Sequence, residues 1–310
     1  MEMPDELRIA LDTLTGAVPR ERLARDARVL SERYRAGCSH LPYVASDDEA
    51  LAYAAARMPA TYCAVYTALR YSLGCTLLRP DSLLDVGAGT GAAAWAAYSL
   101  LDLSSVVCLE REGAMRRIGE ALMRNAQWVS YDLSACAMPH RAGLVVASYV
   151  LGELGESERI RAVEHLWDAA DGLLLLVEPG TPAGYARLAR VRTHLLSLGA
   201  QLAAPCPHGE VCPLPPDDWC HYTCRVARSS LHRALKGGDV PYEDEKFCYF
   251  AFTRGTPSPA TARVLRHPEI HSGYTTLELC THEGLSRRTL SRKDGERYKR
   301  ARKLSTGDQF

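Results

Sequence analysis

The chain has 310 residues, enough for one large α/β domain with an appendage or for two modest domains. Its 37 lysine and arginine residues balance 37 aspartate and glutamate residues, so net charge by itself indicates no class of partner. No apolar run reaches the about 18 residues of a membrane span, and eleven cysteines without a secretion or transit pattern favour a reducing compartment, which we expect to be the cytoplasm.

Residues 1–75 are predicted to form a helical region ahead of the main domain. Apolar residues between Leu23 and Tyr34 recur at steps of three and four, which places them on one helix face. Two further helices are expected, at 47–57 and 62–73. A helical cap of this kind is compatible with many functions.

Residues 76–204 alternate between strand-like apolar runs and helix-like segments. Such alternation predicts a doubly wound α/β core, with a parallel sheet covered by helices on both faces. The expected strands are 82–86, 106–110, 128–133, 143–149 and 172–178. The expected helices are 112–125, 157–170 and 183–198. Ligands of such sheets bind at the carboxyl ends of the strands.

The first predicted strand ends in a glycine-rich turn that contains Gly87, Gly89 and Gly91. Glycines allow the backbone to approach a ligand closely, and the helix that follows presents free N–H groups. The spacing differs from the G-x-G-x-x-G of dinucleotide sites, and Asp85 precedes the first glycine. Together these features resemble motif I of class I S-adenosylmethionine-dependent methyltransferases, with their Rossmann-like sheet. The resemblance implies a turn that holds the methionine part of the cofactor, with Asp85 orienting the loop or facing the cofactor's amine.

Other candidate cofactor contacts lie at the ends of later strands. Glu110 ends the second strand, where a carboxylate can accept hydrogen bonds from both ribose hydroxyls. Asp132 ends the third strand, close to where adenine would lie, although acids at strand ends can equally be helix caps. Ser148 ends the fourth strand, where residues that align the methyl acceptor lie. Neither the Asn/Asp-Pro-Pro-aromatic motif nor a cysteine nucleophile follows there, so the sequence identifies no catalytic residue.

Residues 205–310 differ in composition from the core. They are expected to contain a cysteine-rich region, the last core strands and a small β-rich appendage. A helix at 225–235 and a strand at 246–253 are predicted, followed by a linker at 257–259.

Three cysteines, Cys206, Cys212 and Cys220, are separated by five and seven residues. Thiols this close in a reducing compartment suggest a metal or cluster site, but the spacing is wider than that of a common zinc knuckle. A fourth thiolate would come from Cys224, Cys248 or Cys280. Free cysteines are also often small buried hydrophobes. We expect that role for Cys38, Cys63, Cys75, Cys108 and Cys136.

The cysteine block, with several other runs, resembles the methyltransferase-like proteins of the mitochondrial small ribosomal subunit and their bacterial relatives. The matching runs include 178–182, 204–208, 218–221, 235–238, 242–247, 279–280 and 298–303, with Gly307-Asp308 near the end. Thr306 stands where that family usually has tryptophan. The resemblance implies a four-iron–four-sulfur cluster. Its implied ligands are Cys206, Cys212, Cys220 and Cys280. Binding through Cys280 would pin the terminal segment onto the core.

The segment between Thr281 and Lys303 holds nine lysines and arginines against three acids, with Tyr298 available for stacking. Such a local excess is typical of surfaces that contact phosphates, although a solvated tail is the simpler alternative. The candidate RNA contacts are Arg287, Arg288, Arg292, Lys293, Arg297, Lys299, Arg300, Arg302 and Lys303. Given the resemblance, the expected partner is the small ribosomal subunit and its rRNA, with no membrane partner.

These features favour a factor that binds S-adenosylmethionine and an iron–sulfur cluster and acts on small-subunit rRNA during assembly or translation. An active rRNA methyltransferase is the main alternative, because the cofactor motif is intact. A small-molecule methyltransferase with a structural zinc is a more distant alternative.

Overall fold

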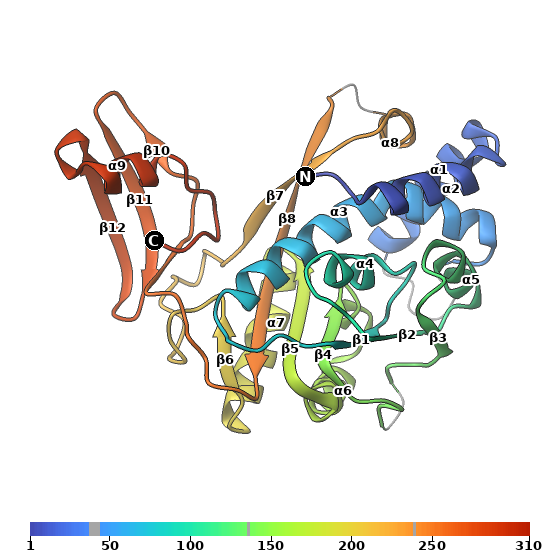
Figure 1. Cartoon of the computed structure of the whole chain (residues 1–310), viewed down its shortest axis with the longest axis horizontal. Helices are drawn as coiled ribbons and strands as arrows, with labels where there is room; N and C mark the ends of the chain where they lie inside the picture. Colours follow the sequence, from blue (N-terminus) through green and yellow to red (C-terminus); the bar gives the residue numbers. More distant parts are fainter. Residues whose placement is uncertain (37–43, 135–136, 238–239) are drawn as a thin grey trace.

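Figure 1 shows the computed structural model of the chain, which describes residues 1–36, 44–134, 137–237 and 240–310. The side chains of residues 34–36 lie outside the description as well. Among the helices of these segments, none combines the length and apolarity needed to cross a membrane.

The N-terminal region is helical, as predicted, but its helices are divided differently. Its helices are α1 (Asp5–Gly16), α2 (Arg20–Ala36) and α3 (Asp47–Leu73). The prediction of two helices between residues 47 and 73 is wrong, because α3 runs through Pro59 without a break. Proline removes a backbone hydrogen bond, but an alanine-rich stretch buried on most sides keeps the helix continuous by tertiary packing. The Ser46 hydroxyl accepts the Glu49 N–H and caps the helix start.

The central sheet has the order β3-β2-β1-β4-β5-β8-β6, in which the first five strands are parallel and β8 is antiparallel. The strands are β1 (Ser82–Val86), β2 (Ser105–Glu110), β3 (Gln127–Ser130), β4 (Ala142–Ser148), β5 (Ala170–Pro179), β6 (Gln201–Ala204) and β8 (Tyr242–Thr253). The connecting helices are α4 (Ala92–Tyr98), α5 (Gly113–Leu122), η1 (Leu151–Glu153), α6 (Glu156–Ala169) and α7 (Pro182–Ser197). This mixed, mostly parallel sheet confirms the predicted fold class.

Both faces of the sheet are buried, which explains the uninterrupted apolar run of β5. Leu83 and Leu173 pack on the face covered by α3 and α4, whereas Leu84 and Leu174 pack on the face covered by α6 and α7. The register pairs Val86 with both neighbouring strands near their ends, so the carboxyl ends of β1, β2 and β4 meet at one edge.

The predicted helix at 225–235 is wrong in its first part. Residues up to 227 belong to strand β7 (Tyr222–Ala227), and the helix α8 (Ser230–Lys236) begins only after Ser229. Tyr222, Cys224 and Val226 are buried while Arg225 is exposed, which is the period of two that a strand requires. Strand β7 pairs with the first half of β8 beyond the edge of the main sheet.

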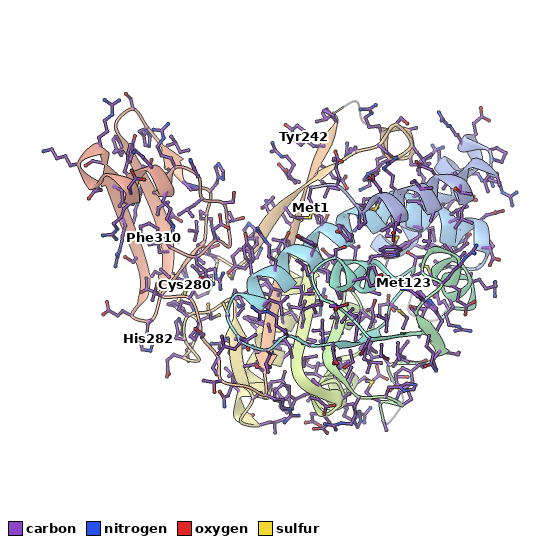
Figure 2. The ribbon with its side chains drawn as sticks, viewed as in Figure 1. Met1, Met123, Tyr242, Cys280, His282 and Phe310 are labelled. Atoms are coloured by element: carbon purple, nitrogen blue, oxygen red, sulfur yellow. The ribbon has the colours of Figure 1, made fainter. Side chains whose placement is uncertain are left out.

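A separate antiparallel sheet follows the linker and stands beside the core (Figure 1). It consists of β9 (Ala262–Val264), β10 (Glu269–Ile270), β11 (Tyr274–Thr281) and β12 (Gly284–Ser291), followed by η2 (Arg292–Asp294) and α9 (Glu296–Ala301). Leu277, Leu279 and Leu290 pack with Tyr298 into a small core of its own. Cys280 lies near the end of β11 (Figure 2).

A buried arginine ties this sheet to the core. Arg263 on β9 is fully buried and donates to the carbonyl oxygens of Pro205 (3.0 Å) and Gly307 (2.8 Å). Its third nitrogen lies 3.3 Å from the Cys75 sulfur. The Tyr71 hydroxyl on α3 donates to Asp308, so the chain terminus also returns to the core.

Candidate functional site

A pocket of about 900 Å³ opens at the carboxyl edge of the parallel strands. Loops after β1 to β5 form its inner wall, and residues of α2, α3 and α8 cover it. Its volume lies in the upper part of the range for small-molecule sites. Five of the predicted cofactor contacts line it: Gly87, Gly89, Glu110, Asp132 and Ser148.

The glycine turn has the conformation that its residue types predict. All three glycines have positive φ angles, +69° at Gly87, +57° at Gly89 and +90° at Gly91. A Cβ at Gly87 would lie 2.6 Å from a methyl carbon of Val150, so this position also needs glycine for space. Gly91 does not line the pocket, because it lies behind the turn at the start of α4.

Asp85 lies beneath the turn, outside the pocket lining. It is fully buried, and its carboxylate accepts the Ala94 N–H at 3.1 Å. Burial raises the pKa of Asp85 to about 7, and the nearby Glu110 carboxylate adds to the shift. Of the two predicted roles, this geometry matches the orientation of the loop rather than contact with the cofactor's amine.

Glu110 joins the loops that follow β1 and β2. One carboxylate oxygen accepts the Gly89 N–H at 2.8 Å, and the other accepts the Glu112 N–H at 2.7 Å. Each oxygen retains a lone pair, so two ribose hydroxyls could still donate to it. Asp132 accepts hydrogen bonds from the Ser134 N–H and hydroxyl at the next loop.

Tyr149, at the end of β4, is a functional candidate to which the sequence assigned no role. It is the one non-glycine residue in the described segments with a positive φ, +57°. A bulky residue in this conformation stores strain, a feature that clusters at functional sites. Its hydroxyl donates to Glu245 at 3.0 Å. No sequence signal could have revealed the strain, because it depends on the packing of the loop.

Two glutamates on the pocket wall also escaped the sequence analysis. Glu153 is open to the cavity yet surrounded by protein, and burial together with the Glu110 charge raises its pKa to about 7. Glu178 is buried at the end of β5, accepts the Leu151 N–H and pairs with Arg187 at 3.0 Å. A carboxylate that ends a wholly apolar strand was the available signal for Glu178.

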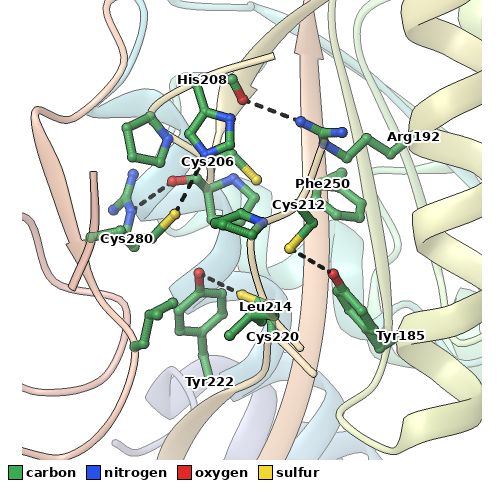
Figure 3. A pocket seen from close by; sticks show the side chains of 15 residues that line it. Tyr185, Arg192, Cys206, His208, Cys212, Leu214, Cys220, Tyr222, Phe250 and Cys280 are labelled. Atoms are coloured by element: carbon green, nitrogen blue, oxygen red, sulfur yellow. Dashed lines mark hydrogen bonds between the residues drawn. The ribbon is translucent and has the colours of Figure 1, made fainter. Parts of the chain in front are cut away.

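The four cysteines that the resemblance selected line one small cavity of about 20 Å³ (Figure 3). Cys206, Cys212 and Cys220 come from the long connection between β6 and β7, and Cys280 comes from β11. Each has a polar neighbour, which for Cys206 is Arg192. Tyr185 donates to Cys212 at 3.1 Å, Cys220 donates to Tyr222 at 3.1 Å, and Cys280 lies 3.7 Å from His208 Nε2.

Electrostatics in this cavity combine burial, neighbouring thiols and two arginines. Burial raises the pKa of Cys206 and Cys220, and it raises the pKa of Cys280 to about 12. Arg192 and Arg263 line the same cavity and act in the opposite direction on Cys206 and Cys280. Bound metal would therefore have to displace protons from these thiols.

Across the part of the chain that the structure describes, no three His, Cys, Asp or Glu side chains converge as they would around one metal ion. The cavity has room for little more than one water molecule, which is less than a four-iron cluster needs. In a four-iron cluster each thiolate binds a different iron, so the ligands need not converge on one point. The donor chemistry fits such a cluster, but the connection between β6 and β7 would have to widen around it.

The remaining cysteines lie elsewhere. Cys63, Cys75 and Cys108 are buried, as expected of small hydrophobes, while Cys38 and Cys136 lie outside the described residues. Cys224 and Cys248 are buried as well and do not line the cysteine cavity.

The nine basic residues predicted to contact RNA are all exposed on β12, η2, α9 and the turn after α9. Arg287 pairs with Glu269 at 2.9 Å and Lys299 with Glu296 at 2.6 Å. The expectation that Tyr298 is available for stacking is wrong, because it is buried against the C-terminal sheet and its hydroxyl accepts from Arg302.

The family described as "Mitochondrial small ribosomal subunit Rsm22" matches residues 47–310 of this chain. The chain belongs to this family. A human relative, "Ribosome assembly protein METTL17, mitochondrial", is 27% identical over 297 residues, covering 83% of this chain and 61% of the relative. The fission yeast protein "Rsm22-cox11 tandem protein 2, mitochondrial" is 24% identical, covering 86% of this chain and 43% of its own length. The Rsm22-family chain thus spans between about two fifths and three fifths of these relatives.

Solved structures similar to the Rsm22-family chain include a TehB-like SAM-dependent methyltransferase from Corynebacterium glutamicum. It has a TM-score of 0.42 and 17% identity, covering 62% of this chain and 88% of that one. Magnesium protoporphyrin IX methyltransferase from Synechocystis has a TM-score of 0.42 and 12% identity, and the match covers 77% of this chain and 98% of that one.

These relatives correct one expectation about the Rsm22-family chain. The prediction of a cytoplasmic location is wrong, because the curated relatives carry mitochondrial in their names. Composition and cysteine usage report only a reducing environment, and they do not distinguish between reducing compartments.

Proposed function

We propose that this member of the Rsm22 family binds S-adenosylmethionine and a four-iron–four-sulfur cluster and acts on small-subunit rRNA during assembly or translation. The observation that carries the proposal is the meeting of four cysteines from two distant parts of the chain around one cavity. Methyl transfer from a sulfonium needs no thiol cluster, so this feature points beyond a plain methyltransferase. The names of the relatives, a ribosome assembly protein among them, support the ribosomal partner.

In this proposal the pocket at the strand ends holds the cofactor. Gly87 and Gly89 allow its methionine part to approach the backbone. The Glu110 carboxylate accepts hydrogen bonds from its ribose hydroxyls. Asp132 and Ser148 contact the remainder. Asp85 and Gly91 act indirectly by shaping the turn. The inner wall carries five carboxylates among the described lining residues, which suits a ligand with a cationic sulfonium.

Cys206, Cys212, Cys220 and Cys280 would hold the cluster as thiolates. A four-iron–four-sulfur cluster supplies covalent links between its ligands and a centre that accepts electrons. The chain's own contribution is to bring β11 against the connection between β6 and β7. Arg192 and Arg263 offset the negative charge of the thiolates. A single zinc ion is disfavoured because the four sulfurs surround a space instead of converging.

One observation favours the alternative of an active rRNA methyltransferase. Glu153 lines the pocket with a pKa raised to about 7, which suits a general base at physiological pH. In that case Glu153 would remove a proton from the acceptor while Tyr149 and Ser148 border the reacting group.

Binding and catalysis can be separated with the full chain and small ribosomal subunits. Calorimetry with S-adenosylhomocysteine is expected to show one site that Gly87→Arg abolishes. Labelled S-adenosylmethionine is expected to transfer no methyl group to the rRNA. Transfer that disappears in both Gly87→Arg and Glu153→Gln would instead establish the methyltransferase. Failure of the unmodified chain to bind S-adenosylhomocysteine would contradict the proposal.

A further inference from the structure

The pocket at the strand ends has two walls of opposite charge. Its inner wall, formed by strand ends and the segments that follow them, carries five carboxylates against two arginines, Arg111 and Arg187, so it is acidic on balance. Its outer cover carries four cations from other elements: Arg28 on α2, Arg57 on α3, Arg228 after β7, and Lys236 on α8. We call these four residues the basic mouth. Helix α8 packs against both α2 and α3, so the four side chains come from neighbouring elements.

The carboxylates of the mouth do not balance its cations. The Glu243 carboxylate accepts hydrogen bonds from Arg228 at 2.7 Å and from Lys236 at 2.7 and 2.8 Å, so two cations share one carboxylate. Arg28 and Arg57 are exposed, and neither forms an ion pair with a carboxylate in the described segments. The negative charge of Glu245 interacts with Arg57, but the Glu245 carboxylate also accepts a hydrogen bond from the Tyr149 hydroxyl.

The basic mouth adjoins the end of the pocket where a methyl acceptor would lie. Arg57 is close enough to Tyr149 for the two to interact electrostatically, and Tyr149 directly follows Ser148, the last residue of β4. Met58, the residue after Arg57, accepts a 3.7 Å hydrogen bond at its sulfur from the Thr90 hydroxyl of the glycine turn. The cofactor has one carboxylate against two cationic groups, so it could pair with at most one of the four cations, and the remaining positive charge favours a second, anionic ligand.

We propose that the basic mouth binds phosphate groups of a single-stranded RNA segment and so places one nucleotide over the cofactor edge of the pocket. This inference rests on the proposed function and names the surface that would engage the rRNA close to the cofactor. Arginines suit this task because their fixed fork of donors matches phosphate oxygens. A single strand fits better than a duplex, because only an unstacked nucleotide can enter a pocket.

The exposed basic tail on β12, η2 and α9 is a separate surface, so the two can be tested independently. The variant Arg28→Gln/Arg57→Gln removes the two mouth cations that have no ion pair, and it leaves the Glu243 network intact. The control Arg70→Gln/Arg233→Gln removes the same charge from α3 and α8 at positions that do not line the pocket. Arg28→Lys/Arg57→Lys keeps the charge and tests whether charge alone is sufficient.

Binding of a short fluorescein-labelled single-stranded RNA is measured by anisotropy over a series of salt concentrations, with S-adenosylhomocysteine present. Each lost phosphate contact lowers the dependence of log K on log salt by about 0.7 for a single strand. The glutamine mouth variant is therefore expected to flatten the slope by about 1.4, and to weaken binding about tenfold at low salt. The control is expected to keep the slope of the unmodified chain, and the lysine variant most of it.

Calorimetry on the same variants separates the mouth from the cofactor site. Affinity for S-adenosylhomocysteine is expected to change less than about threefold, or about 0.7 kcal/mol. An unchanged RNA slope in the glutamine variant would overturn the inference. A tenfold loss of S-adenosylhomocysteine affinity would overturn it too, by assigning these arginines to the cofactor's carboxylate. Displacement of the RNA by adenosine monophosphate at equal phosphate concentration would assign the site to a free nucleotide instead. A chain that binds RNA but no S-adenosylhomocysteine would contradict the proposed function and leave the slope comparison as the test of the mouth.

Discussion

The replacement Arg263→Met tests what holds the C-terminal sheet against the core. Arg263 is fully buried, and its guanidinium donates to the carbonyl oxygens of Pro205 and Gly307, which belong to segments about 100 residues apart. Methionine is of similar length, so the replacement removes the donors and leaves most of the packing in place.

The expected magnitude follows from these two contacts. Hydrogen bonds from a charged donor contribute about 1.5–3 kcal/mol each, and both acceptors would be left buried without a partner. We therefore expect the free energy of unfolding to fall by about 3–6 kcal/mol. The matched control is Arg287→Met on the same small sheet, where an exposed ion pair with Glu269 contributes about 0–1 kcal/mol.

Urea unfolding of the full chain measures both variants, and hydrogen exchange locates the change. Amides of β9 and β11 are expected to lose protection in Arg263→Met, while those of β1 and β4 keep it. A loss below about 1 kcal/mol, equal to that of the control, would refute the assigned role.

Three further outcomes are expected. Gly87→Ala adds a Cβ 2.6 Å from a Val150 methyl carbon at a position with positive φ. Calorimetry is therefore expected to show at least about tenfold weaker S-adenosylhomocysteine binding. The control Gly16→Ala, whose Cβ would have no atom within 4 Å, is expected to have no effect. The pKa of Asp85 in the folded chain is about 7, above its ordinary 3.8. Between these two pH values the folded chain keeps a proton that the unfolded chain has lost. The free energy of unfolding therefore falls as pH rises from about 4 to about 7. Asp85→Asn is expected to flatten that decline in pH-dependent urea unfolding, and an unchanged decline would contradict the assignment. Arg292→Glu/Lys293→Glu in the tail is expected to weaken binding to small-subunit rRNA and to reduce its salt dependence, measured by filter binding, and equal binding would leave the tail as a solvated surface.

The main domain was predictable because its signals are local. Apolar runs bounded by glycine and proline indicated five parallel strands, and the glycine turn indicated where the first of them ends. The antiparallel β8 and the strand β6 depend on pairing between distant segments. Local periodicity therefore located β8 only in part and did not indicate β6 at all.

The boundaries that failed were decided by tertiary contacts. Pro59 suggested a break in α3, but burial of the surrounding alanines keeps the helix continuous. The segment 225–227 has no strong helix breaker, and its pairing with β8 determines that it is a strand.

The candidate site divides in the same way. Residue type and position relative to strand ends located the pocket residues Glu110 and Asp132, while the resemblance selected Cys280 from among three possible fourth cysteines. The strained Tyr149, the buried Arg263 and the basic mouth could not be predicted. Each depends on side chains that meet only after elements far apart in the sequence have packed.

The central claim is that four cysteines from two parts of the chain hold one iron–sulfur cluster. Iron and acid-labile sulfide, measured with the visible absorption spectrum of anaerobically purified full chain, test it most directly. We expect about four irons and four sulfides per chain, lost in Cys280→Ser and retained in the buried control Cys248→Ser. One zinc per chain without visible absorption, or equal iron in Cys280→Ser and Cys248→Ser, would contradict the account.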